Sequence, residues 1–141
     1  MRDGKLYFST SDSGLFYAVD AKTGAALFSL KFIWPMFSSP TIAGNTLYIG
    51  SNEGKLIAID LASQKAAWVF RSDGSQQNGP TYTKADGGPN YEAAFGPDFF
   101  YDNMVVGVAR MMSVGAVLSS PAVGNDVVVF GSTDRNVYAL E

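Results

Sequence analysis

The chain has 141 residues, 47% of them hydrophobic and 16% charged, which excludes intrinsic disorder and suffices for one domain with a hydrophobic core. Its 10 basic and 13 acidic side chains are scattered along the sequence, which argues against a nucleic-acid-binding protein. Histidine and cysteine are both absent. A Ser-His-Asp triad, a thiol nucleophile, a disulfide and a thiolate zinc site are therefore excluded.

The sequence predicts no membrane span and no signal peptide. Its longest apolar run, residues 104–118, is interrupted by Gly107, Arg110 and Gly115 and is shorter than the roughly 18 residues that cross a bilayer. Met1 is followed by a polar tripeptide and a strand-like run, which is not the pattern of a signal peptide. We therefore expect either a cytoplasmic protein or one whose export signal has been lost or removed.

Short strands are predicted over the first half of the chain. Apolar and polar residues alternate in short runs that Gly, Asn and Asp separate, which favours strands joined by tight turns. In chain order the predicted strands are 5–9, 15–20, 26–31, 40–43, 46–51, 55–60 and 66–71.

Residues 72–118 interrupt this pattern and are interpreted as an insertion, with a degenerate hidden blade as the alternative. Residues 72–89 are polar and rich in glycine, which predicts a mobile loop. Phe100, Met104, Val108 and Met111 then follow at helical spacing, which predicts a helix over about 98–113.

The insertion is rich in aromatic residues. One interpretation is that they pack the helix onto the strands or cover an open sheet edge. The other is a surface that binds a ligand or a partner, because aromatic clusters supply a large contact area. The residues of this candidate binding surface are Tyr82, Tyr91, Phe95, Phe99 and Tyr101.

The last predicted strands, 121–123, 127–132 and 136–140, repeat an earlier part of the chain. Residues 44–51 match residues 124–132, and Ser38-Ser39-Pro40 matches Ser119-Ser120-Pro121. Gly50 and Gly131 lie 81 residues apart, and Asp20 and Asp60 lie 40 apart. A period of about 40 residues in strand-forming sequence is typical of propeller blades.

The repeat carries a motif that resembles the A-x-D-x-x-x-G-x-x-x-W sequence of PQQ-like β-propellers. The first copy has phenylalanine in the tryptophan position, the second has Gln64 where glycine is usual, and the third begins at Ala139. We expect the aspartate to accept hydrogen bonds from turn amides, the glycine to take a positive φ, and the aromatic ring to wedge between neighbouring blades. The motif residues are Ala18, Asp20, Gly24, Phe28, Ala58, Asp60, Trp68 and Ala139.

The resemblance implies an all-β fold, a partial propeller of antiparallel blades with one helix-containing insertion. We expect a single domain over 1–141, with blade-like repeats at 3–32, 38–71 and 119–141. A closed propeller has about 4–8 blades of about 40 residues each, which is more than this chain supplies. We therefore expect either a piece of a larger propeller or a homo-oligomer, for example a dimer in which two arcs face each other.

The resemblance also bears on function. In quinoprotein dehydrogenases of this family the quinone lies on the propeller axis beside calcium, sandwiched partly by a vicinal cysteine pair, which this chain lacks. Asp12, Glu53 and Asp134 occupy comparable turns, where solvated carboxylates are the default. We predict no catalytic, cofactor-binding or metal-binding residue and no cofactor, with PQQ and calcium possible only within a larger propeller.

The predicted function is a non-catalytic module for protein or ligand binding or for scaffolding, as in the assembly-factor members of the family, which bind protein segments. The alternative is a fragment of a PQQ-dependent quinoprotein dehydrogenase whose cofactor site lies in missing blades. A gene remnant without a selected task is a third reading. Most family members are exported, which implies a periplasmic location.

Overall fold

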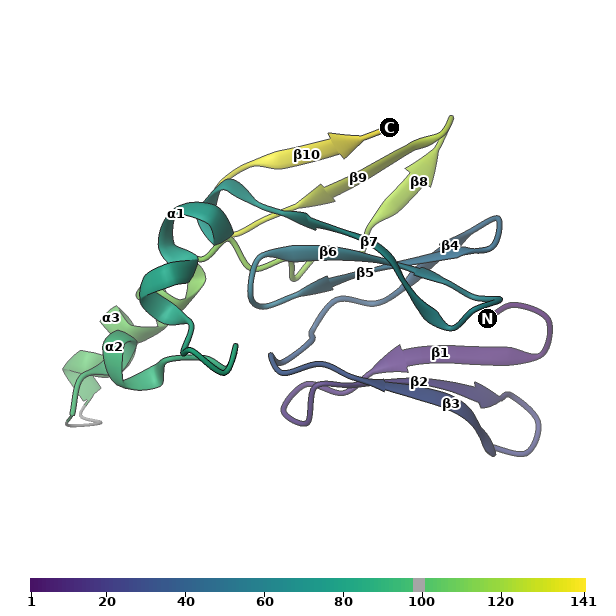
Figure 1. Cartoon of the computed structure of the whole chain (residues 1–141), viewed down its shortest axis with the longest axis horizontal. Helices are drawn as coiled ribbons and strands as arrows, with labels where there is room; N and C mark the ends of the chain where they lie inside the picture. Colours follow the sequence, from purple (N-terminus) through teal and green to yellow (C-terminus); the bar gives the residue numbers. More distant parts are fainter. Residues whose placement is uncertain (98–100) are drawn as a thin grey trace.

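Stacked antiparallel sheets make up most of the computed structural model, which describes residues 1–97 and 101–141 (Figure 1). The first sheet, blade 1, contains β1 (Lys5–Ser9), β2 (Leu15–Asp20) and β3 (Ala26–Lys31). Blade 2 contains β4 (Thr41–Ala43), β5 (Thr46–Ser51), β6 (Lys55–Asp60) and β7 (Lys65–Arg71). Blade 3 contains β8 (Ala122–Gly124), β9 (Val127–Gly131) and β10 (Val137–Leu140). Strands adjacent in sequence pair within each blade, so the fold is an all-β partial propeller.

Each blade has two faces because successive side chains of a strand point to opposite sides. In blade 2, Leu47 pairs with Ile59 and Ile49 with Ile57, and these four residues form its trailing face, toward blade 1. Its leading face, toward blade 3, is formed by Tyr48, Leu56, Ala58 and Phe70.

A hydrophobic core fills each junction between blades. Between blades 1 and 2, Phe16 packs with the trailing face of blade 2, and Tyr7 and Phe28 border this core. Between blades 2 and 3, Leu56 packs with Val128 and Phe130. Because side chains alternate strictly between the two faces of each blade, both junctions have the same arrangement. In each, the leading face of one blade packs against the trailing face of the next blade.

Serine hydroxyls link the inner edges of the three blades. The Ser9 hydroxyl donates to the Ser38 carbonyl oxygen at 3.2 Å, and the Ser38 hydroxyl donates to the Ser119 carbonyl oxygen at 2.9 Å. Ser119 in turn exchanges hydrogen bonds with Gly131 of β9. The repeated Ser-Ser-Pro segments thus hold neighbouring blades together.

The insertion differs from the prediction because its first half is helical. The expectation of a mobile loop over residues 72–89 is wrong: helix α1 spans Asp73–Tyr82. The predicted single helix is also wrong in number, since α2 (Tyr91–Phe95) precedes α3 (Tyr101–Met112) in the described part of the insertion. Helix α3 corresponds to the helix predicted over 98–113, of which residues 98–100 lie outside the described residues.

Helix α1 forms despite two glycines and Pro80 because groups from outside it satisfy its first amides. The Ser72 hydroxyl accepts from the Ser75 amide at 3.1 Å, as an N-cap does. From blade 3, the Tyr138 hydroxyl accepts from the Asp73 amide at 2.8 Å and Asp134 Oδ2 accepts from the Gly74 amide at 3.1 Å. Blade 3 therefore fixes the start of this helix.

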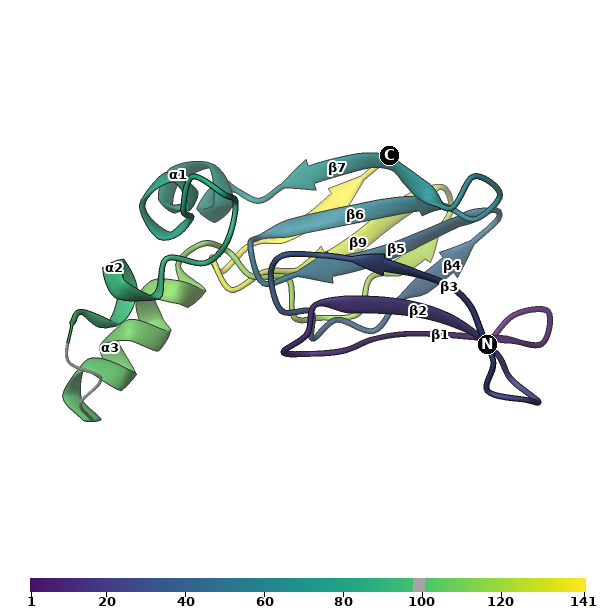
Figure 2. The same cartoon turned by 60° about the horizontal axis from the view of Figure 1, so that its bottom comes forward.

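The helices gather beyond one end of the strands, on the side of the β1–β2 and β5–β6 turns (Figures 1 and 2). A third core joins them to the connector between blades 1 and 2, with Trp34 packing against Phe95, Met111 and Val114. Among the described residues, no helix is long and apolar enough to cross a membrane.

Candidate functional site

The structure brings together only part of the predicted aromatic surface. Tyr91 and Phe95 lie one turn apart on α2 with ring centroids 6.2 Å apart, and both line one pocket. Tyr82 borders the core around Trp34 and does not line this pocket. Phe99 lies outside the described residues, as does the side chain of Tyr101.

The aromatic pocket, as we call it, has a volume of about 260 Å³ and lies where the blades meet the insertion. The β1–β2 and β5–β6 turns supply polar residues, the connector between blades 1 and 2 supplies one wall, and α2 and α3 supply the other. The lining residues are Asp12, Trp34, Pro35, Phe37, Asn52, Tyr91, Phe95, Val108, Met111 and Met112.

The sequence did not predict that the connector between blades 1 and 2 forms part of the aromatic pocket. Trp34, Pro35 and Phe37 stand in a short segment between two predicted strands, and their apolar, aromatic character was the available signal. Trp34 is buried, and its Nε1–H donates to the Gly87 carbonyl oxygen at 2.9 Å, which holds the indole in place. Phe37 and Tyr91 remain 55% and 44% exposed. The pocket thus has a buried floor and an exposed aromatic rim.

Asn52 is the unusual polar residue of the pocket. Its side chain is 8% exposed, and its backbone amide donates to the Pro35 carbonyl oxygen at 3.2 Å. Its carboxamide oxygen Oδ1 is buried and finds no hydrogen-bond partner in the part of the chain that the structure describes. Buried polar atoms are almost always hydrogen-bonded, so an unpaired acceptor on a residue that lines a pocket is a candidate partner for a ligand that donates hydrogen bonds.

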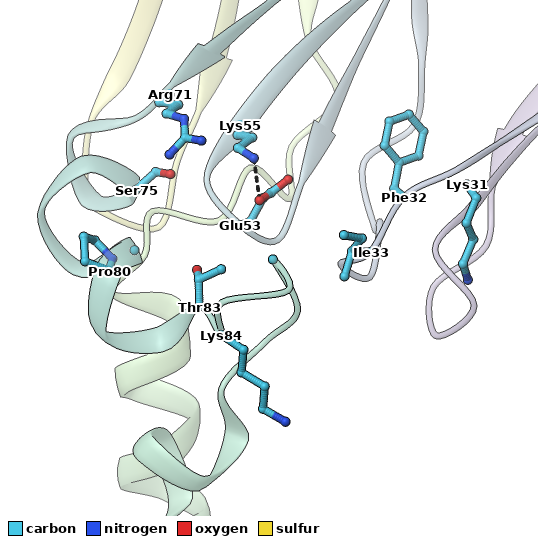
Figure 3. A pocket seen from close by; sticks show the side chains of 12 residues that line it. Lys31, Phe32, Ile33, Glu53, Lys55, Arg71, Ser75, Pro80, Thr83 and Lys84 are labelled. Carbon is cyan, nitrogen blue, oxygen red and sulfur yellow. Dashed lines mark ion pairs between the residues drawn. The ribbon is translucent and has the colours of Figure 1, made fainter.

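A larger cavity, of about 510 Å³, lies between β3, the β5–β6 turn and α1 (Figure 3). Its basic residues are Lys31, Lys55, Arg71 and Lys84. Lys55 forms an ion pair with Glu53 at 2.6 Å. Lys31 and Lys84 extend away from Arg71 in Figure 3, so the positive charges do not converge on one point. This arrangement supports no specific anion site.

The motif aspartates stabilise the turns that follow β2 and β6. Asp20 Oδ1 accepts from the amides of Lys22 and Thr23 at 3.0 and 2.7 Å. Asp60 Oδ1 accepts from the Ser63 amide at 2.7 Å, and Oδ2 accepts from the Asn45 carboxamide at 2.7 Å. Hydrogen bonds from Thr23 above all lower the pKa of Asp20, and hydrogen bonds from Ser63 lower that of Asp60.

The other motif residues occupy structural positions. Ala18 and Ala58 are fully buried, and Ala139 lies opposite Val129 in blade 3. Gly24 has a φ of 74°, and Gln64, which replaces glycine in the second copy, has a φ of 58°.

The two aromatic residues of the motif differ from each other. Phe28 packs against the core between blades 1 and 2, 5.9 Å from Phe16. Trp68 contacts Tyr48 of its own blade at 5.8 Å and stays 40% exposed, because the described part of blade 3 has no fourth strand opposite it.

Asp134 and Tyr138 form a polar cluster where α1 meets blade 3. The Tyr138 hydroxyl donates to Asp134 Oδ2 at 2.7 Å. Burial acts to raise the pKa of Asp134, but hydrogen bonds from Tyr138, Gly74, Ser132 and Asn136 together outweigh it and lower that pKa. Burial raises the pKa of the Tyr138 hydroxyl. The cluster anchors the insertion.

The residues present do not fit the PQQ and calcium site of a quinoprotein dehydrogenase. The sequence has no cysteine for a vicinal pair. Within the described ranges, no group of three or more acidic side chains is placed to hold a metal ion.

Comparison with known proteins gives a family match and a set of similar folds. The model of the family described as outer membrane protein assembly factor BamB matches residues 1–90. A search of curated proteins returned no significant match.

Solved structures with this fold include BamB from Moraxella catarrhalis, with a TM-score of 0.60 and 14% identity over 99% of this chain and 31% of that one. They also include a europium-containing methanol dehydrogenase, with a TM-score of 0.59 and 18% identity over 94% and 24% of the two chains. The quinohemoprotein alcohol dehydrogenase from Comamonas testosteroni has a TM-score of 0.55 and 17% identity over 92% and 16%.

This chain thus spans less than a third of each of these structures. At such identities the likeness shows the fold alone. The family model, however, matches well over half of the chain, and the matched residues include the first two copies of the blade motif. The protein therefore belongs to the BamB family of PQQ-like propeller repeats.

Proposed function

We propose that this chain is a non-catalytic binding module that takes up part of a protein or another ligand in the aromatic pocket. The observation that carries the proposal is the combination of an exposed aromatic rim, Phe37 and Tyr91, with the buried and unpaired Oδ1 of Asn52. Exposed aromatic side chains supply contact area, and a fixed polar group supplies orientation. The name of the matching family, an assembly factor, is consistent with a partner that is a protein.

Selection of displayed peptides on the intact chain tests this proposal. We expect selected peptides to lose at least tenfold in affinity on Phe37→Ala, because truncating an aromatic anchor at an interface removes a hot spot. Val105→Ala is the matched control, since Val105 is exposed on α3 but does not line the pocket. Peptides that bind Phe37→Ala as tightly as the unaltered chain would place binding elsewhere.

The second candidate is a fragment of a PQQ-dependent dehydrogenase, and the fold shared with two such enzymes favours it. In that case the cofactor site lies in other blades, because the residues here do not fit it. PQQ binding in the presence of calcium, by this chain joined to further blades encoded beside it, would support this candidate. Further blades alone would fit either candidate, because the chain spans only 31% of the BamB structure, but a binding module predicts no binding of PQQ.

We also propose that a second copy of the chain completes the arc. The trailing face of blade 1, formed by Leu6, Phe8, Tyr17 and Val19, stands where blade 2 has Leu47, Ile49, Ile57 and Ile59. Leu6 and Phe8 are each 41% exposed, whereas the four residues of blade 2 are 0–3% exposed. Blade 1 thus presents an apolar face of the kind that the other junctions bury.

The leading face of blade 3 is the complement of that surface. Val129, Val137 and Ala139 form it, and Val137 is 76% exposed. Since every junction within the chain joins a leading face to a trailing face, blade 3 of one copy has the right face for blade 1 of another. Two copies joined twice in this way have about six blades, within the range of known propellers. Blades encoded elsewhere are the alternative partner.

The family resemblance supports a location outside the cytoplasm, which cell fractionation tests directly.

A further inference from the structure

We propose that the ligand of the aromatic pocket is an organic cation, an alkylammonium or guanidinium group carried on an apolar stem. This inference rests on the proposed binding function and names the chemistry of its ligand. Three features of the pocket carry it: its charge, its unpaired acceptor and its aromatic walls.

The charge of the pocket is negative. Asp12, in the β1–β2 turn, is the charged residue among the described residues that line it, and no lysine or arginine stands among them. The Asp12 carboxylate is exposed and makes no ion pair with any described residue. An incoming cation would thus meet an available carboxylate, and none of the residues that line the pocket carries a like charge.

The acceptor is Asn52 Oδ1, in the β5–β6 turn, which is equivalent to the β1–β2 turn that carries Asp12 in the preceding blade. Its backbone bond to Pro35 fixes the residue, while Oδ1 stays buried and, within the described chain, unpaired. Ammonium and guanidinium groups carry several N–H donors and no acceptor. Such a ligand carries donors for the Asp12 carboxylate and for the Asn52 carboxamide oxygen, which a purely apolar ligand lacks.

The walls suit a cation on an apolar stem. Trp34, Phe37, Tyr91 and Phe95 surround the pocket, and the faces of aromatic rings attract cations. The only N–H donor of the Trp34 indole already donates to Gly87, so this ring offers its π-system rather than a competing donor. Met111 and Val108 supply contacts for the stem.

Calorimetric titration of the intact chain with paired probes tests the inference. Two cationic probes, Nα-acetyl-lysine amide and Nα-acetyl-arginine amide, keep their charged side chains and are compared with the neutral Nα-acetyl-norleucine amide. A second pair compares n-butylammonium with n-butanol. We expect each cationic probe to bind at least tenfold more tightly than its neutral counterpart. Stronger binding of the acetylated amino-acid amides than of n-butylammonium would indicate a peptide side chain as the ligand. The reverse order would indicate a free amine.

Two variants and one control locate the effect. Asp12→Asn should weaken binding of the cationic probes about fivefold to tenfold and leave the neutral probes unchanged. Asp126→Asn is the control, because Asp126 is an exposed carboxylate in the turn between β8 and β9, away from the pocket. Asn52→Leu should reduce the preference for cations while the chain stays folded, since it removes a buried polar atom that has no partner in the described chain.

The outcomes separate this inference from the proposed function. If neutral probes bind as tightly as cationic ones, the pocket binds apolar groups, the cation inference is wrong and the binding function stands. If no probe binds and peptide selection also fails, both are wrong. If Asp126→Asn weakens binding as much as Asp12→Asn does, the preference reflects the overall charge of the chain and not the pocket, which overturns the inference.

Discussion

Replacing Gly54 by alanine should destabilise the chain far more than replacing Gly24, although the two glycines have the same backbone conformation. Both lie in turns, with φ values of 75° and 74°. A Cβ on Gly24 would meet nothing within 4 Å. A Cβ on Gly54 would lie 2.1 Å from the Val114 carbonyl oxygen and 2.7 Å from Ser72 Oγ. The pair therefore separates backbone strain from the packing of the insertion on blade 2.

The magnitudes follow from these distances. Gly24→Ala should cost about 1 kcal/mol, the penalty of a left-handed conformation for a residue with a Cβ. Gly54→Ala carries the same penalty plus overpacking against backbone that cannot move aside, which adds about 1–3 kcal/mol. We expect a total loss of about 3 kcal/mol in the free energy of unfolding.

Urea unfolding of the two variants and the unaltered chain measures these losses, at one protein concentration because self-association would add to stability. Limited proteolysis supplies a second readout, since Gly54→Ala should expose the insertion to cleavage and Gly24→Ala should not. Equal losses in the two variants would refute the reasoning, because they would mean that the insertion does not rest on the β5–β6 turn.

Further substitutions test the turn motif and the anchor of the insertion. Gln64→Gly should stabilise the chain by about 1 kcal/mol in urea unfolding, because glycine relieves the positive φ of 58° that Gln64 adopts; a loss of stability would contradict this. Asp134→Asn should destabilise the chain at pH 7, and the difference from the unaltered chain should shrink as the pH falls below about 4. Since the pKa of Asp134 is lowered in the folded chain, its contribution is present above the unfolded pKa and is lost as the pH falls through the folded one. Urea unfolding from pH 7 to pH 2.5 checks this, and a difference independent of pH would count against the anchor.

The strands could be predicted because local sequence decides them. Alternation places Leu47, Ile49, Ile57 and Ile59 on one face, and the 40-residue repeat shows where each blade begins. The bounds of β1, β2 and β3 agree with the prediction to the residue, since a glycine stands one or two residues before each of these short runs.

Helix α1 could not be predicted because its stability comes from distant residues. Its own sequence, with Gly74, Gly79 and Pro80, has low helix propensity. Asp134 and Tyr138, some 60 residues away, satisfy its first amides, and nothing in residues 72–89 signals this. Helix α3 was predictable by contrast, because its apolar residues repeat at helical spacing.

The candidate site was predictable only in part, because some of its residues stand out in the local sequence and others depend on tertiary packing. Tyr91 and Phe95 stood out as aromatic residues in a segment without blade motifs, and the structure places both in the pocket. Asp12 and Asn52 looked like ordinary turn residues, because only the packing of two blades against the insertion buries the Asn52 side chain. The unpaired acceptor is a property of tertiary structure, which no local pattern records.

The central claim is that the chain is an arc with two complementary unpaired faces. Light scattering after gel filtration, repeated over a dilution series, tests this claim most directly because it measures the mass of the particle in solution. The account predicts a particle of about twice 15.1 kDa that Val137→Asp converts to monomer, because a charge in the leading face of blade 3 opposes burial. Lys22→Asp, in an exposed turn away from both faces, should leave the particle unchanged. A well-behaved monomer at every concentration would contradict the account, since the exposed faces of blades 1 and 3 would then need no partner.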